Sequence, residues 1–211
     1  MPRILSQNDV TDFRDRLCEA ALKRFAEEGE AGISLRRLAG DLGVSPTTPY
    51  RYFRDKNEIV AAIRAQAFDR FADKLERAFQ SSDDVRARAD AVGRAYVAFA
   101  FADPQAYRLM FDLVQPDESL YPDLARAGQR ARATMSAHLH AMKAAGKLAG
   151  DPELIGHVFW SALHGLIVLH LAGKLCGGPD FDAIFAETSR LLSLGLAADA
   201  HSARPQPRSR K

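Results

Sequence analysis

Residues 45–56 bring together side chains that can hold a polyanion. Hydroxyl groups and cations follow one another at Ser45, Thr47, Thr48, Tyr50, Arg51, Tyr52 and Lys56. Hydroxyl, guanidinium and ammonium groups donate hydrogen bonds to phosphate oxygens and to base edges. A helix surface that only faces water would more often carry Glu and Lys than two threonines and two tyrosines. We therefore expect this segment to contact nucleic acid, and a solvated helix hairpin without function is the alternative.

The residues around this segment predict a helix–turn–helix unit over residues 34–53. Spacings of three and four residues put one apolar stripe on a first helix, formed by Leu35, Leu38, Ala39 and Leu42. Ser34 precedes this stripe as a candidate N-cap, and Gly43 can adopt the positive φ of a tight turn. Ser45 and Pro46 then predict a second helix start, because proline is tolerated at the first helical position. In such units the second helix enters the major groove of DNA.

One stretch of the chain is similar to the DNA-binding signature of TetR-type transcriptional repressors. It runs from Gly43-Val44-Ser45 through Tyr50-Arg51-Tyr52-Phe53 to Lys56. A preceding stripe that ends at Gly29 resembles the family's first helix, and it consists of Leu17, Cys18, Ala21, Leu22 and Phe25. The resemblance covers roughly residues 11–71 and implies a DNA-binding domain there.

The resemblance also implies which residues contact DNA. Positions that match the family's phosphate contacts are Ser45, Thr48, Tyr50, Tyr52 and Lys56. Candidates for contact with base edges are Thr47, Pro49 and Arg51, with a thymine methyl against Pro49 and a guanine under Arg51. Arg36 and Arg37 begin the first helix of the unit, and we expect them near the DNA backbone.

Pro49 departs from the family pattern, which usually has leucine at this position. Proline has no N–H, so the first intrahelical hydrogen bond, to the carbonyl of Ser45, cannot form. We therefore expect a stiff second helix that is distorted in its first turn.

The basic residues are concentrated locally. The chain is typical of soluble globular proteins, with 47% hydrophobic and 27% charged residues and a net charge of +2. Residues 1–60 hold ten basic and ten acidic residues, whereas residues 34–56 hold five basic and two acidic ones. We expect the acids Glu27, Glu28 and Glu30 to face away from the phosphates.

Helical patterns fill the rest of the chain, which predicts an all-α fold. The expected helices are a connecting helix over 56–78, then 83–102, a short one after Pro104, 123–147, 153–175 and 180–197. We predict a ligand-binding and dimerisation domain over 79–197 and a basic, disordered tail over 198–211. The first residues lack the apolar core of a signal peptide, so a cytoplasmic location is expected.

A second resemblance lies in the helix expected over 153–175. Trp160, His164 and Gly165 form the Trp-x-x-x-His-Gly pattern of the WHG type of TetR C-terminal domain. This implies a pocket for an apolar small molecule lined by Phe101, Tyr107, Met110, Phe111, Trp160 and His164. Trp160 and His164 share one helix face, but two interpretations remain open: direct contact with a ligand, or packing within the core.

The same helix is long enough to span a membrane, because residues 154–173 contain no charged residue. Its four polar residues favour a different interpretation; they are His157, Ser161, His164 and His170. We expect a helix that is buried on both sides in a dimer.

The sequence gives little support for a metal site or for enzymatic activity. His138 and His140 are two residues apart and point away from each other on a helix, so no metal site is expected. Ser161 and His164 lack an orienting acid and a strand–turn–helix elbow, so no enzyme and no cofactor are expected. Cys18 and Cys176 lie in apolar patterns, which predicts buried free thiols.

The sequence therefore predicts a homodimeric, DNA-binding transcriptional repressor that a small apolar ligand releases from a palindromic operator. The family resemblance implies that the last two helices form the dimer interface and that the connecting helix transmits ligand binding. The alternative is a ligand-binding or interaction protein of the same fold that has lost operator function.

Overall fold

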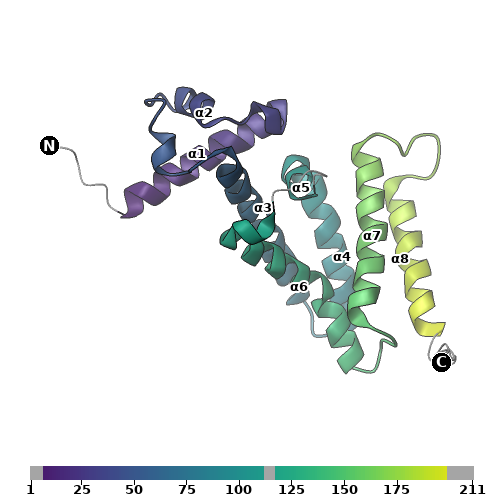
Figure 1. The fold of residues 1–211 in the computed structure, drawn as a ribbon. Helices are drawn as coiled ribbons and strands as arrows, with labels where there is room; N and C mark the ends of the chain where they lie inside the picture. The colour runs from purple at the N-terminus through teal and green to yellow at the C-terminus, as the bar shows by residue number, and fades with distance from the viewer. Residues whose placement is uncertain (1–6, 112–116, 199–211) are drawn as a thin grey trace, which may run out of the picture. The chain divides into compact units, whose positions relative to one another are not determined.

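The computed structural model describes residues 7–111 and 117–198. Within these ranges the chain is helical and contains no strand, which confirms the predicted all-α fold class. The α-helices are α1 Gln7–Glu28, α2 Leu35–Asp41, α3 Lys56–Phe79, α4 Val85–Ala102, α5 Pro104–Phe111, α6 Pro122–Ala144, α7 Pro152–Leu171 and α8 Phe181–Ala198 (Figure 1). Three short 3-10 helices accompany them, η1 Glu30–Gly32, η2 Pro49–Arg51 and η3 Glu118–Leu120.

Glycines end two helices earlier than the apolar pattern predicts. Helix α6 ends at Ala144 and not near residue 147, because Gly146 adopts a φ of 68° and its N–H donates to the carbonyl of Lys143. Helix α7 ends at Leu171 in the same way, with Gly173 at a φ of 64°. Positive φ is accessible to glycine at no steric cost, so both residues close the helix with a left-handed turn.

The chain forms two compact units that do not follow the predicted domain limits. One unit contains residues 1–72 together with 103–131, and the other contains 73–102 together with 132–211. Helix α5 and the first part of α6 thus pack with the N-terminal unit. The functional limits 11–71 and 79–197 remain a prediction, and residues 199–211, most of the expected tail, lie outside the described residues.

The core of the first unit joins α1, α2 and α3. Leu17, Leu38, Ile59 and Ile63 are fully buried, and Phe53 is only 1% exposed. These residues bear out the apolar stripes expected for the first helix, for the helix–turn–helix unit and for the connecting helix. The buried stripes leave the polar faces of α2 and of residues 45–51 on the surface.

A buried arginine connects α3 to later parts of the same unit. Arg64 is 2% exposed, and its Nε donates to the carbonyl of Leu109 at 3.2 Å. Its Nη2 lies 3.8 Å from the carboxylate of Glu118. A buried guanidinium must be paired and hydrogen-bonded, so Arg64 holds α5 and η3 against the connecting helix.

The second unit packs α4 against α7 and α7 against α8, which run side by side in Figure 1. The indole Nε1 of Trp160 donates to the hydroxyl of Tyr96 at 3.0 Å. Large apolar side chains nevertheless remain between 45% and 65% exposed on α7 and α8, and they are Leu154, Val158, Val168, Leu169, Leu191 and Leu194. Helix α7 is thus not buried on both sides in the single chain. By length and composition alone, α7 could also cross a membrane.

The two cysteines differ in their surroundings. Cys18 is buried and free, as expected, and burial raises the pKa of its thiol to about 12. Cys176 is also free but exposed, because α7 ends before it and residue 176 lies in the loop to α8. The expectation of a buried thiol was wrong for Cys176.

The second helix of the helix–turn–helix unit is not an α-helix. Residues 46–48 form a turn, and only Pro49–Arg51 are helical, in 3-10 form. Within residues 45–51 the hydrogen bonds join residues three apart, from Thr48 N to the Ser45 carbonyl at 2.9 Å and from Arg51 N to the Thr48 carbonyl at 3.1 Å; after this segment, Phe53 N donates to the Pro49 carbonyl at 3.0 Å, four residues back. Pro49 has no N–H to donate to Ser45, and this explains a larger departure from the α-helix than the expected distortion of one turn.

Replacing Pro49 by leucine should restore an α-helix over residues 46–53. Leucine supplies the missing N–H and removes the ring that crowds the Ser45 carbonyl. The measurement is the backbone 13Cα chemical shift of these residues, which moves downfield in an α-helix. Pro46→Ala is the control and should leave the 3-10 segment unchanged. Unchanged shifts in the leucine variant would show that Pro49 does not cause the irregular geometry.

Candidate nucleic-acid interface

Helix α2 presents two arginines to solvent because its other residues are anchored. The hydroxyl of Ser34 accepts a hydrogen bond from the backbone N–H of Arg37 at 3.2 Å, which confirms the predicted N-cap. Leu35 and Leu38 are buried beneath the helix. Arg36 and Arg37 consequently lie on the exposed face.

The turn after α2 exposes hydroxyl groups. Gly43 adopts a φ of 65°, as the sequence predicted, and the N–H of Val44 returns to the carbonyl of Ala39 at 2.9 Å. Ser45 and Thr47 are exposed, and their hydroxyl oxygens lie 2.9 Å apart. Both hydroxyls are accessible for hydrogen bonds to a phosphate or a base edge.

The 3-10 segment divides its side chains between surface and core. Tyr50 is 57% exposed and Arg51 is exposed, whereas Pro49 is buried. Because its ring is buried, Pro49 has little surface to offer a base edge, and its expected contact with a thymine methyl remains a prediction. Tyr52 is half-buried, with its ring centroid 4.7 Å from that of Phe13, and Thr48 is half-buried as well.

Several cations of the unit are already paired with acids. Arg37 Nη1 lies 2.8 Å from a carboxylate oxygen of Glu28, and Lys56 Nζ lies 3.2 Å from Glu30. Glu28 and Glu30 thus lie beside two of the cations expected to contact DNA, and the expectation that these acids face away from the phosphates remains a prediction. Within the described residues, Arg36 and Arg51 belong to no ion pair.

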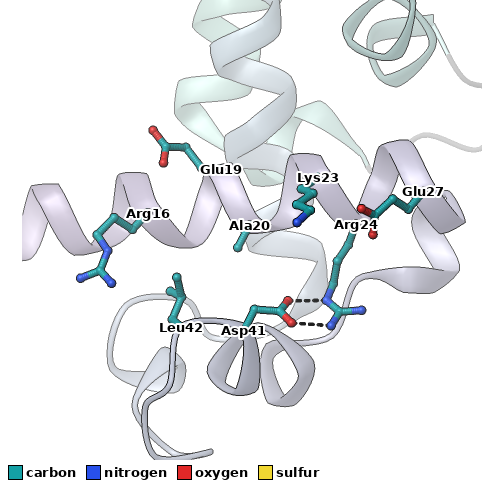
Figure 2. Close-up of a pocket in the computed structure, with 8 residues that line it drawn as sticks. All are labelled: Arg16, Glu19, Ala20, Lys23, Arg24, Glu27, Asp41 and Leu42. Atoms are coloured by element: carbon teal, nitrogen blue, oxygen red, sulfur yellow. Dashed lines mark hydrogen bonds and ion pairs between the residues drawn. The ribbon is translucent and has the colours of Figure 1, made fainter.

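A further ion pair joins α1 to the end of α2. Arg24 Nη2 donates to Asp41 Oδ1 at 2.5 Å, and Nε donates to Oδ2 in a bidentate pair (Figure 2). The guanidinium lowers the pKa of the Asp41 carboxyl below its ordinary value. The pair borders a groove whose lining mixes cations with acids, and none of the predicted site residues lies in it: Arg16, Glu19, Ala20, Lys23, Arg24, Glu27, Asp41 and Leu42.

The predicted ligand-binding residues fall in both compact units. Tyr107, Met110 and Phe111 belong to the first unit, where the rings of Tyr107 and Phe111 lie 5.0 Å apart. Phe101, Trp160 and His164 belong to the second unit. The grouping of all six residues in one pocket therefore remains a prediction.

Within the second unit, Phe101 does not lie beside Trp160. Its ring lies 4.7 Å from that of His170 and 4.7 Å from that of Phe181. His170 follows Trp160 by ten residues, which is about 15 Å along an α-helix. Trp160 instead contacts Tyr96 and lies 6.1 Å from the ring of His164.

Burial affects two histidines of the second unit. It lowers the pKa of His164 below its ordinary value and lowers the pKa of His138 to about 4. Both imidazoles are therefore neutral near pH 7, and a neutral ring can take part in apolar packing or donate one hydrogen bond. Packing and ligand contact remain open for His164.

Two family models match most of the chain. The model described as "Bacterial regulatory proteins, tetR family" matches residues 17–63, and the model described as "Tetracyclin repressor-like, C-terminal domain" matches residues 89–192. With the geometry above, these matches define a bacterial regulatory protein of the helix–turn–helix class. The chain belongs to the tetR family. This family consists of regulatory proteins and not of enzymes.

Relatives of known sequence carry regulatory names. The HTH-type transcriptional regulator Rv1816 of Mycobacterium tuberculosis is 29% identical over 149 residues, which are 68% of this chain and 61% of that protein. The uncharacterized HTH-type transcriptional regulator Rv0681 of the same species is 27% identical over 87% of this chain and 81% of its own. The chain thus matches less than two thirds of the length of the first relative.

Solved structures share the fold. A protein of unknown function from Rhodococcus sp. RHA1 has a TM-score of 0.78 and 29% identity, covering 93% of this chain and 99% of its own. The transcriptional regulator FadR from Bacillus subtilis, solved in complex with stearoyl-CoA, shares the fold with a TM-score of 0.70 at 16% identity, covering 86% of this chain and 98% of its own. The assignment of this chain to the WHG type remains a prediction.

Two features of the interface leave no signal in the local sequence pattern. The acids that pair with Arg37 and Lys56 lie nine or more residues away along the chain, beyond any helical spacing. Pro46, which was expected only as a helix start, is exposed beside Thr47.

Proposed function

We propose that this protein is a DNA-binding transcriptional regulator that acts as a repressor on a palindromic operator. The observation that carries the proposal is the exposed polar surface of one helix–turn–helix unit whose apolar residues Leu35, Leu38 and Phe53 are buried in the core. This surface contains Arg36 from α2, Ser45 and Thr47 from the turn, and Tyr50 and Arg51 from η2. Membership in the tetR family supports the same function.

The exposure of these side chains and their ion pairs suggest which of them contact base edges and which contact phosphates. Thr47 and Arg51 are exposed and are our candidates for base edges, while Ser45 and Tyr50 offer hydroxyls to phosphates. Arg36 has no acid partner among the described residues and is available to the DNA backbone. Half-buried Thr48 and Tyr52, and the paired cations Arg37 and Lys56, complete the phosphate contacts.

Alanine replacements should separate unpaired from paired cations. We expect Arg36→Ala to weaken binding to all DNA sequences and to reduce the salt slope by about 1, and Arg37→Ala to weaken binding less, because Glu28 already neutralises Arg37. Lys56→Ala should weaken binding to all sequences and reduce the salt slope by up to about 1. The measurement is fluorescence anisotropy with duplex DNA from the region that flanks the gene, at several salt concentrations. Arg77→Ala, an exposed cation at the end of α3, is the control. Equal affinities for all variants would exclude this interface.

We further propose that the protein is a homodimer through α7 and α8. Six large apolar side chains are exposed on these two helices, and such a patch marks an interaction surface in a soluble protein. A second copy that covers the patch would bury α7 on both sides, in line with a cytoplasmic protein and not a membrane span.

A charge placed in this patch should dissociate the dimer. Leu191→Glu would bury a carboxylate without a partner, and we expect dimerisation to weaken at least about tenfold. Light scattering after size-exclusion chromatography measures the mass. Leu120→Glu, at a residue that is 65% exposed on η3, should leave the mass unchanged. A dimer that survives Leu191→Glu would place the interface elsewhere.

We also propose that a small apolar molecule binds near Trp160 and His164 and releases the protein from DNA through α3, which continues from one unit into the other. Trp160 is the only tryptophan of the 211 residues, so its fluorescence reports on this site alone.

A molecule that releases DNA should change the emission of Trp160. Apolar compounds found by a thermal-shift screen can be titrated while both emission and DNA anisotropy are followed. Trp160→Phe should weaken the response to such a compound while DNA affinity stays the same. Release from DNA without any change in emission would contradict the proposed pocket.

A ligand-binding or interaction protein without operator function is the second candidate. The acids paired with Arg37 and Lys56 favour it, because they reduce the positive charge that DNA would meet. The DNA titration above distinguishes the two functions, since this second candidate would show no salt-dependent binding.

A further inference from the structure

Two backbone features bring acids from the end of α1 to the DNA-binding cations. Gly29 turns the chain after α1 with a φ of 68°, and η1 follows directly. Gly32 packs so closely against α1 that a Cβ there would lie 2.6 Å from the Cβ of Glu28. This tight connection fixes the positions of Glu28 and Glu30 relative to α2 and to the start of α3.

Each acid meets a different cation. Glu28 accepts from Arg37 at 2.8 Å, and Glu30 lies 3.2 Å from the ammonium group of Lys56. The side chains of all four residues are between 37% and 43% exposed, so the pairs lie at the protein surface. Exposed ion pairs contribute little to stability, so holding the fold together is a weak explanation for them.

The two acids differ in the cation partners that they would keep if a DNA phosphate took their place at Arg37 and Lys56. Glu28 also accepts from Arg24 at 3.2 Å, so it keeps a cation if Arg37 turns to DNA. Glu30 has no second ion pair within the described residues. Once Lys56 contacts a phosphate, Glu30 would remain nearby as an unpaired negative charge that repels it.

We propose that Glu28 and Glu30 are affinity-setting residues, which compete with DNA phosphates for Arg37 and Lys56. Glu30 is the stronger of the two, since it has no other cation to hold it. This inference rests on the proposed DNA-binding function and concerns the same surface. The acids lower affinity for DNA of every sequence, so that stable binding requires the additional contacts of Thr47 and Arg51 with base edges.

Neutralising each acid tests the proposal on the full-length protein. Fluorescence anisotropy with a duplex of random sequence measures affinity at several salt concentrations. We expect Glu30→Gln to bind about three- to tenfold more tightly at low salt. Its plot of log affinity against log salt should be steeper by up to about 1, because one more cation releases a counterion. Glu28→Gln should show a smaller gain.

Glu27→Gln is the matched control. Glu27 is exposed beside Glu28 and forms no ion pair among the described residues, so this variant makes the same change in net charge without freeing a cation. We expect it to change affinity by less than about twofold. Adding Glu30→Gln to Lys56→Ala should give a smaller gain than in the wild type, because no cation is freed and only the repulsion between Glu30 and the phosphate is removed.

The possible outcomes distinguish a failure of the inference from a failure of the proposed function. Salt-dependent binding by the wild type, with Glu30→Gln no tighter than Glu27→Gln, would overturn the inference alone. The same holds if the gain from Glu30→Gln is undiminished in the Lys56→Ala background, or if Glu30→Gln weakens binding as a structural defect would. Failure of every variant to bind any duplex would overturn the DNA-binding function together with the inference.

Discussion

The burial of Phe53 is the interaction on which the DNA-binding surface depends. This ring is 1% exposed in the core formed by α1, α2 and α3. The guanidinium of Arg14 lies 4.2 Å from its centroid and also donates to the carbonyl of Tyr52. Burial of one large aromatic side chain stabilises by about 1.5–3 kcal/mol. It fixes the irregular segment between α2 and α3 at its C-terminal end, while Ser45, Thr47, Tyr50 and Arg51 remain exposed.

This anchoring compensates for a segment with few regular hydrogen bonds. Pro49 prevents an α-helix, so the backbone between residues 46 and 51 closes by bonds between residues three apart. Short 3-10 pieces have poorer hydrogen-bond geometry than an α-helix and need support from packing. The burial of Pro49 and Phe53 provides that support. The same proline that breaks the helix thus helps to attach the segment to the core.

Electrostatics at this surface follow from the connection between α1 and α2. A bidentate pair between Arg24 and Asp41 and the pairs of Glu28 and Glu30 join the elements of the unit. The local excess of positive charge in the sequence is therefore smaller in the folded protein than a count of residues suggests. Arg36 and Arg51 then matter more for the proposed DNA contact than their number indicates, because neither has an acid partner among the described residues.

The sequence by itself determined the all-α fold, the first helix of the helix–turn–helix unit with its Ser34 cap, the turn at Gly43 and the connecting helix. These features are local, since periodic apolar residues, caps and glycine turns act within a few residues of chain. Only the tertiary structure decided that Pro49 is buried, that Phe101 lies away from Trp160, and that Glu28 and Glu30 pair with DNA-binding cations. Each of these depends on packing or charge between residues that are not neighbours in sequence, and such contacts leave no periodic signal along the chain.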